Sequence, residues 1–190
     1  MSEAIVEFIP PDLNRTLILD VGCAKGYVGH QIRIKKMGDP IILGLDIWVP
    51  YIKHIKNVHV SYARIYNDLI IADAICMPFR EHVFNLLIAS ELLEHLSRED
   101  GFRLLNELER ICKNRIITST PSRFFEQGEV DSNPYQRHLS LWKEEDLIKL
   151  GYEVKIIYVK QPRVSEIVDK IRLFFRLPRS LGVMVAWKTL

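Results

Sequence analysis

The sequence predicts an α/β fold, in which helices cover both faces of a doubly wound, mostly parallel sheet. Short apolar runs alternate repeatedly with helical patterns, and neither an internal repeat nor a low-complexity linker interrupts this order. A strand, a helix and a further strand in succession place the two strands parallel in one sheet. The chain has 190 residues, enough for a substantial core. We expect residues 1–190 to form a single domain.

The first elements surround a glycine-bearing turn. Residues 1–15 contain consecutive prolines and are expected to form an extended lead-in. Residues 16–21 are an apolar run that ends on acid and valine, which favours a buried strand. A helix is predicted over 26–36 and ends before Gly38-Asp39-Pro40. Its inward side chains are expected to be Tyr27, Val28, Ile32 and Ile34.

The next strand–helix unit begins at residues 41–45, a strand that terminates at Asp46. A helix is predicted after Pro50, and the third strand, 69–72, ends at Asp73. The helix is expected to carry Tyr51, Ile52, Ile55 and later Ala63 on its apolar side.

The fourth strand, 84–89, ends at Ser90-Glu91. Ser97 is a favourable N-cap with Asp100 at the third helical position, which predicts a helix through Cys112. The fifth strand is expected at 115–118, followed by a long polar and aromatic segment, 122–141. A helix over 143–150, a strand over 152–159, an amphipathic helix over 164–177 and a final strand over 181–187 complete the prediction.

The composition limits the partners and the cellular location that can be expected for the chain. Apolar residues make up 48% of the chain and charged residues 26%, with a formal net charge of +2, so charge alone does not indicate nucleic acid or a membrane as partner. The three cysteines are far apart and form no metal or disulfide pattern, which predicts a reducing, cytoplasmic location. Neither a secretory signal nor a transmembrane run is visible. The oligomeric state is left open.

Four of the first five predicted strands end on an acidic residue at the same edge of the sheet: Asp20, Asp46, Asp73 and Glu91. The carboxyl ends of parallel strands meet at one edge of the sheet, where ligands bind at the topological switch point. The repetition of acids at this edge therefore predicts a ligand site.

The turn after the first strand limits the kinds of ligand that the predicted site could bind. Gly22 and Gly26 leave room for close approach of a ligand, and Asp46, about twenty residues on, is placed to bind ribose hydroxyls. The dinucleotide pattern fails, because its second and third glycine positions hold Ala24 and Tyr27. Several acids with Lys25 as their one cationic neighbour favour a ligand with a cationic part. S-adenosylmethionine, with its ammonium, sulfonium, ribose diol and adenine, meets these requirements.

Several motifs together resemble class I S-adenosylmethionine-dependent methyltransferases of the methyltransferase type 11 kind. The resemblance covers about residues 15–160 and implies a Rossmann-like methyltransferase fold of seven strands, the last antiparallel. Ala24 replaces a usual glycine, and Asn85 replaces a usual aspartate, which we expect to affect local packing only. The matching residues are Asp20-Val-Gly22-Cys-Ala24-Lys-Gly26, Asp46, Asp73-Ala74, Met77-Pro78-Phe79, the segment 83–96 and the segment 116–121.

The resemblance also implies individual roles. Asp20 and the 22–26 backbone would hold the methionine part, Asp46 the ribose and Asp73 the adenine amino group, while Ser90 and Glu91 would lie near the transferred methyl. The implied cofactor-binding residues are Asp20, Gly22, Cys23, Ala24, Gly26, Asp46, Ile47, Asp73, Ala74 and Ser90.

A second group follows the fourth strand. Glu91, Glu94 and His95 would share one face of a helical turn, and His138 lies in the loop after the fifth strand, at the same edge. Two carboxylates and two imidazoles are suitable ligands for Mg²⁺ or Mn²⁺. Small-RNA 3′-end methyltransferases have a similar pattern with a later His and Trp, here His138 and Trp142, and some ubiquinone-biosynthesis O-methyltransferases look similar. The alternatives are His138 as a metal-free base or substrate contact, and a purely structural role.

The predicted function is methyl transfer to an oxygen, nitrogen or carbon atom of a small or medium-sized substrate, with His138 and Glu91 as catalytic residues. Two alternatives remain: a metal-assisted RNA-terminal methyltransferase, for which only Arg123 and Arg137 supply positive charge near the site, and a non-catalytic methyltransferase-like subunit. The segment 164–177 is expected to cover the sheet or to contact a membrane surface or partner. The expected wall of the substrate pocket comprises Phe124, Phe125, Tyr135, Arg137 and Trp142.

Overall fold

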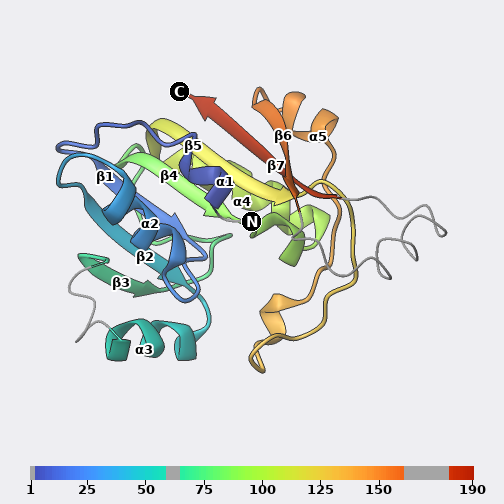
Figure 1. Cartoon of the computed structure of the whole chain (residues 1–190), viewed down its shortest axis with the longest axis horizontal. Helices are drawn as coiled ribbons and strands as arrows, with labels where there is room; N and C mark the ends of the chain where they lie inside the picture. The colour runs from blue at the N-terminus through green and yellow to red at the C-terminus, as the bar shows by residue number, and fades with distance from the viewer. Residues whose placement is uncertain (1–2, 59–64, 161–179) are drawn as a thin grey trace.

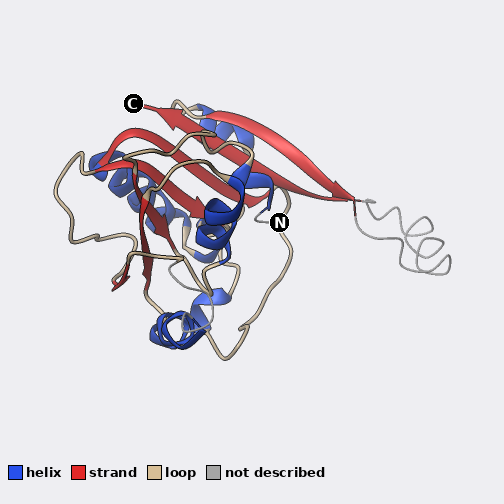
Figure 2. Ribbon diagram, turned by 60° about the vertical axis from the view of Figure 1, so that its left-hand side comes forward, coloured by secondary structure: helices blue, strands red, loops and turns tan. Residues whose placement is uncertain are grey.

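The computed structural model describes residues 3–58, 65–160 and 180–190. Its strands form one seven-stranded sheet in the order β3-β2-β1-β4-β5-β7-β6 (Figures 1 and 2). Strands β3, β2, β1, β4 and β5 pair in parallel, whereas β7 is antiparallel to both β5 and β6. The predicted fold class is therefore confirmed, including the antiparallel last strand. The strands are β1 (Leu17–Val21), β2 (Ile41–Asp46), β3 (Asp68–Ile71), β4 (Phe84–Ser90), β5 (Cys112–Pro121), β6 (Glu153–Lys160) and β7 (Ser180–Thr189).

Helices lie on both faces of the sheet, because each strand sends alternate side chains into two separate cores. In β4, for example, Leu87 belongs to one core cluster and its neighbours Leu86 and Ile88 to the other. None of the helices in the described ranges has the length and apolar character that a membrane crossing requires. The helices are α1 (Glu3–Val6), α2 (Tyr27–Lys35), α3 (Val49–Val58), α4 (Arg98–Ile111) and α5 (Glu144–Ile148), with 3₁₀ turns η1 (Leu93–His95) and η2 (Pro134–Gln136).

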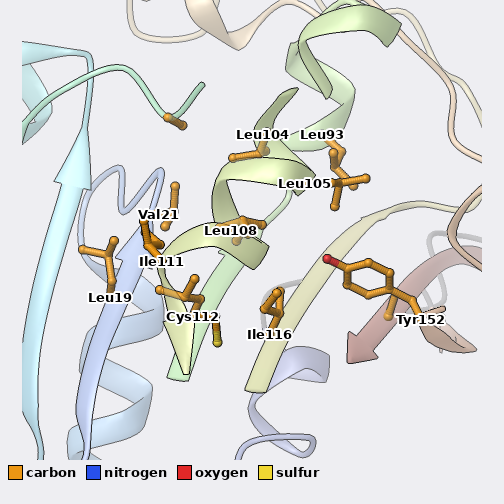
Figure 3. Close-up of a cluster of buried hydrophobic side chains, with 14 of the residues drawn as sticks. Leu19, Val21, Leu93, Leu104, Leu105, Leu108, Ile111, Cys112, Ile116 and Tyr152 are labelled. Atoms are coloured by element: carbon orange, nitrogen blue, oxygen red, sulfur yellow. The ribbon is translucent and has the colours of Figure 1, made fainter. Parts of the chain in front are cut away.

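The first core lies between the sheet and α4. Figure 3 shows Leu104, Leu105 and Leu108 of α4 facing strand residues such as Leu19 and Ile116. All five side chains are at most 1% exposed. Burial of each leucine or isoleucine contributes about 1.5–3 kcal/mol, so this contact fixes α4 on the sheet.

The second core lies on the opposite face, beneath α1, α2 and α3. Ile5 of α1, Ile32 of α2 and Ile55 of α3 meet Ile18 and Ile88 from the sheet. This face supports the turn between β1 and α2 and the loop after β2, so it positions the start of both ligand-facing segments.

Several local predictions need correction. Part of the expected extended lead-in forms α1, because burial of Ile5 in the second core fixes a helical turn. Tyr27 and Ile34 are 44% and 60% exposed and do not face inward. Tyr27 is the first residue of α2 and turns to the ligand edge, while Ile34 lies two positions after the buried Ile32, on the other side of the helix.

Other boundaries agree closely with the sequence. Ser97 caps α4 as predicted, since its hydroxyl accepts from the Asp100 N–H at 3.1 Å. Helix α4 ends at Ile111, and Cys112 instead begins β5. Strand β5 is longer than predicted because Cys112 pairs with Phe84 of β4 and because β7 pairs with β5 as far as Pro121. Asn85 accepts a hydrogen bond from the Leu17 N–H at 2.9 Å, a local packing contact. The predicted helix over 164–177 and the position of Ala63 lie outside the described residues.

Candidate functional site

A cleft of about 660 Å³ opens at the carboxyl edge of the parallel strands. It is bounded by the turn after β1, the loop after β2, the segment after β4 and the loop between β5 and α5. This is the switch-point edge at which the sequence predicted a ligand site, and every residue predicted to bind the cofactor lines the cleft, with the exception of Gly26.

The turn after β1 is held open by left-handed backbone conformations. Gly22, Ala24 and Gly26 have φ values of 72°, 44° and 86°. A Cβ on Gly22 would meet the Leu92 side chain, and one on Gly26 would meet the Tyr66 ring. At both glycines a side chain would therefore point into packed protein and not into the cleft. Glycine is therefore required here by the left-handed backbone and the close neighbours, and not by the space that a ligand needs.

Asp46, at the end of β2, joins the two loops that form the cleft floor. One carboxylate oxygen accepts from the Ala24 N–H at 2.8 Å and the other from the Trp48 N–H at 2.7 Å. Burial raises the pKa of Asp46, and these two hydrogen bonds act in the opposite direction. Each oxygen keeps a further lone pair with which it can accept a ligand hydroxyl.

Asp20, at the end of β1, lies deeper than predicted. It is 1% exposed, and its carboxyl accepts a hydrogen bond from the Tyr66 hydroxyl at 2.5 Å. Burial raises the pKa of Asp20 to about 7, which the Tyr66 hydrogen bond partly offsets. Tyr66 itself is buried beside α2 and was not among the site residues predicted from the sequence. The one sequence feature that reflects the position of Tyr66 is Gly29, where an added Cβ would lie 2.6 Å from the Tyr66 ring.

The opposite rim of the cleft is formed after β3. Asp73 is exposed there, and its carboxylate accepts from the Ile75 N–H at 3.1 Å, while Ala74 is buried beside it. Ile47 lines the same cleft from the loop after β2. An acidic acceptor and an apolar side chain thus occur together, a combination that suits a flat polar ring.

Glu91 does not share a helical face with Glu94 and His95, contrary to the prediction. Its backbone is left-handed, with φ of 51°, and precedes the short η1 turn that contains the other two residues. The Ser119 hydroxyl donates to the Glu91 carboxylate at 2.7 Å and lies 3.2 Å from the Ser90 hydroxyl. Burial raises the pKa of Glu91, and both Ser90 and Glu91 line the cleft.

Glu94, His95 and His138 do converge. One donor atom from each lies within 4.8 Å of the others, and the two imidazole rings are 4.9 Å apart between centroids. The Glu94 carbonyl accepts from the Leu139 N–H at 2.7 Å, which joins the loop before α5 to η1. Burial, with the Glu91 charge as a second cause, raises the pKa of Glu94 well above its usual range, and burial lowers the pKa of His95.

The loop between β5 and α5 closes one side of the cleft, and Figures 1 and 2 show it reaching toward α3. Lys25 forms an ion pair with Asp131 at 2.6 Å, and the Tyr51 hydroxyl donates to Asp131 at 3.2 Å. Tyr135 packs edge-on against Trp48, with 6.2 Å between ring centroids. The loop is therefore attached to both segments that form the cleft floor.

The predicted aromatic wall is only partly correct. Phe125 and Tyr135 line the cleft, whereas Phe124 is 51% exposed outside it. Arg137 pairs with Glu129 and does not line the cleft. Trp142 is buried in the first core, where its indole N–H donates to the Leu93 carbonyl at 3.3 Å, because α4 and η1 enclose it.

The cleft is strongly acidic. Among the described residues that line it, seven carry a carboxyl group, and Lys25 is the only lysine or arginine. Lys25 is itself paired with Asp131. Those carboxyl groups that are ionised favour cationic or neutral ligands and disfavour a diphosphate.

Comparisons with known proteins agree with the fold. A model of the methyltransferase-domain family matches residues 18–115. A candidate methyltransferase of Bacillus halodurans C-125 is 15% identical, with a TM-score of 0.69 and coverage of 99% of this chain and 97% of that one. A SAM-dependent methyltransferase of Archaeoglobus fulgidus is 19% identical, with a TM-score of 0.64 and coverage of 100% and 92%.

A third solved structure contains two bound small molecules. Phosphoethanolamine N-methyltransferase 2 of Haemonchus contortus, in complex with phosphomonomethylethanolamine and S-adenosylhomocysteine, is 13% identical, with a TM-score of 0.68. The alignment covers 99% of this chain and 52% of that one. At these identities the likeness shows the fold. No curated protein sequence matches the chain.

Proposed function

This chain belongs to the methyltransferase-domain family, whose model matches residues 18–115, and we propose that it transfers the methyl group of S-adenosylmethionine to a small or medium-sized substrate. The accepting atom is an oxygen, nitrogen or carbon. The observation that carries the proposal is the acidic cleft at the carboxyl edge of β1, β2 and β4, where Asp46 bridges the two loops of the floor.

The donor set of this cleft fits the cofactor. Asp46 has one free lone pair on each oxygen for the ribose hydroxyls, and Ile47 lies beside it for the adenine. Asp73 and the Ala74 N–H would bind the adenine edge. The negative field of the cleft suits the ammonium and sulfonium groups, and Asp20 contributes to it when ionised.

S-adenosylmethionine supplies a methyl carbon bonded to a sulfonium, which a nucleophile displaces in line. The protein's task is alignment and, where the nucleophile carries a proton, acceptance of that proton. We assign contact with the substrate to His138 and Glu91, both of which line the cleft. The Ser119 hydroxyl fixes the Glu91 carboxylate, and a main-chain carbonyl fixes the His138 ring, so both groups are preorganised.

The acidic lining favours a neutral or cationic substrate. A metal-assisted reaction on an RNA end is the weaker alternative, because Arg123 and Arg137 do not line the cleft and a polyanion would meet seven carboxyl groups. A binding subunit without activity is less favoured as well, because Asp20, Asp46 and Asp73 are all retained.

Calorimetric titration tests the proposal. We expect S-adenosylmethionine and S-adenosylhomocysteine to bind and NAD not to bind. Asp46→Ala should weaken binding of the cofactor by about 1–3 kcal/mol, the cost of leaving buried polar groups unpaired. The control is Asp68→Ala, an exposed acid at the amino end of β3, away from the cleft, which should bind normally. Binding of NAD alone would contradict the proposal.

A further inference from the structure

Three side chains from distant parts of the chain meet beside the cleft. Glu94 and His95 come from η1, and His138 comes from the loop before α5. One donor atom of each lies within 4.8 Å of the other two, a separation that small shifts of side-chain torsions reduce to that of ligands around one ion. All three residues line the cleft, so a bound ion would be in reach of a substrate.

Glu94 has an unpaired oxygen in this group. The residue is 3% exposed, and its Oε2 has no hydrogen-bond partner among the described residues. A buried carboxylate oxygen without a partner is unfavourable, because desolvation is not offset by a hydrogen bond or a cation. A positively charged ligand at this point would supply the missing partner.

The two histidines are oriented as metal ligands are. Nδ1 of His95 lies 3.1 Å from the Arg137 carbonyl oxygen, and Nδ1 of His138 lies 2.9 Å from the Phe125 carbonyl oxygen. A carbonyl only accepts, so Nδ1 carries the proton in each ring and the lone pair of the neutral imidazole is on Nε2. A main-chain carbonyl that fixes the tautomer in this way is a recurrent second layer around metal-binding histidines.

We propose that Glu94, His95 and His138 bind one divalent first-row transition-metal ion through the Glu94 carboxylate and Nε2 of both histidines. Two imidazoles and one carboxylate favour Zn²⁺, Mn²⁺, Fe²⁺ or Co²⁺, whereas Mg²⁺ and Ca²⁺ prefer sites made of oxygen atoms. Glu91, which was predicted to belong to this group, is not among the residues whose donor atoms converge, and the Ser119 hydroxyl donates to its carboxylate.

Three protein ligands leave coordination positions for an exogenous ligand. Resting on the proposed methyl transfer, these positions would bind the accepting oxygen or nitrogen of the substrate and lower its pKa. The substrate class is then one that chelates a metal, such as a vicinal diol or a hydroxyl beside a carbonyl. With Nε2 bound to the ion, His138 would act on the substrate through the ion, in place of the direct contact assigned to it above.

The test is direct metal binding by the full chain after removal of metals with a chelator, without any cofactor. Titration with Co²⁺, followed by its visible absorption, should show one site per chain, and Zn²⁺ should displace the Co²⁺. Mg²⁺ should bind on the order of 100-fold more weakly than Zn²⁺. His138→Ala and Glu94→Gln should each weaken Co²⁺ binding on the order of 100-fold or more, beyond the effect typical of second-layer changes.

A matched variant separates this site from adventitious binding. His82→Ala, which removes an exposed histidine outside the cleft whose Nδ1 also contacts a carbonyl, should leave Co²⁺ affinity unchanged. Should Glu94→Gln fail to fold, the ¹⁵N shifts of the imidazole Nε2 atoms of His95 and His138 on addition of Zn²⁺ provide a second measurement on the unaltered chain. Absence of Co²⁺ binding, or equal binding by His138→Ala, would overturn the proposal. Cofactor binding is measured separately, so failure of the metal site leaves the proposed methyl transfer intact.

Discussion

The Tyr66 hydroxyl donates a hydrogen bond to the Asp20 carboxyl at 2.5 Å, beneath the turn that connects β1 to α2. Both residues are at most 5% exposed. Burial is the main reason that the pKa of Asp20 is raised to about 7, and the nearby Asp46 charge adds to it. The acid that ends β1 is therefore coupled to the stability of the fold as well as to the electrostatics of the cleft.

The first prediction concerns the pH dependence of stability. Between about pH 4 and pH 7 the folded chain keeps a proton on Asp20 that the unfolded chain has lost, so the free energy of unfolding falls as pH rises through this window. The contribution is at most about 1.4 kcal/mol per pH unit. Asp20→Asn removes this contribution, so its free energy of unfolding should depend less steeply on pH than that of the unaltered chain.

Chemical denaturation at several values between pH 4.5 and pH 8 measures this difference. Asp46 and Glu91, whose pKa values are also raised, contribute to the pH dependence of stability with the same sign in both proteins. Their contributions therefore cancel when the two slopes are compared. Glu126→Gln, an exposed acid, serves as control and should leave the slope unchanged. Parallel curves for Asp20→Asn and the unaltered chain would refute the assigned titration.

The second prediction concerns the packing of Tyr66 against α2. A Cβ on Gly29 would lie 2.6 Å from the Tyr66 ring and 2.8 Å from Ile65. Gly29→Ala gains about 1 kcal/mol of helix propensity but overpacks a buried contact, which typically costs 1–3 kcal/mol or more. We expect net destabilisation in urea denaturation.

A double-mutant cycle assigns this cost to the Tyr66 ring. Gly29→Ala should be less costly in a Tyr66→Leu background, because the smaller side chain leaves room for the added methyl group. Gly128→Ala, where a Cβ meets no atom within 4 Å, should leave stability nearly unchanged. Additive effects of Gly29→Ala and Tyr66→Leu would show that the ring is not the obstacle.

Local signals predicted the α/β class, because the first strands are short apolar runs and four of the first five end on an acid, whereas the antiparallel last strand was implied by the family resemblance. The same local signals placed Asp46 and Asp73 at the cleft correctly. Tyr66 was not predictable, because its position depends on contacts with Gly29 and Asp20, which are distant in sequence. Long-range packing of this kind leaves no periodic pattern.

The prediction that Glu91 shares a helical face with Glu94 and His95 was wrong for a related reason. Three- and four-residue spacing implies one face only on a helix, and Glu91 instead adopts a left-handed conformation before η1. Its partner, Ser119, comes from the neighbouring strand β5. Trp142 likewise looked like a pocket residue in a polar loop, yet the loop returns to the sheet there and buries the indole in the first core.

The third prediction concerns the loop between β5 and α5. Asp131 holds this loop to the cleft floor through Lys25 and Tyr51. Both members of the ion pair are about half exposed, with side-chain values of 50% and 45%, so the pair adds little to global stability. Asp131→Ala should therefore leave the thermal unfolding midpoint nearly unchanged.

The same variant should alter ligand binding, because the loop carries Phe125, Tyr135 and His138 to the cleft. We expect the cofactor dissociation constant, measured by calorimetry, to rise several-fold at low salt. The difference from the unaltered chain should shrink in 1 M salt, where exposed ion pairs are screened. Asp39→Ala, which removes an exposed partner of Arg33 outside the cleft, is the matched control and should bind normally. Equal affinities of Asp131→Ala and Asp39→Ala at low salt would mean that the other loop contacts, such as Tyr135 on Trp48, are sufficient to hold the loop in place.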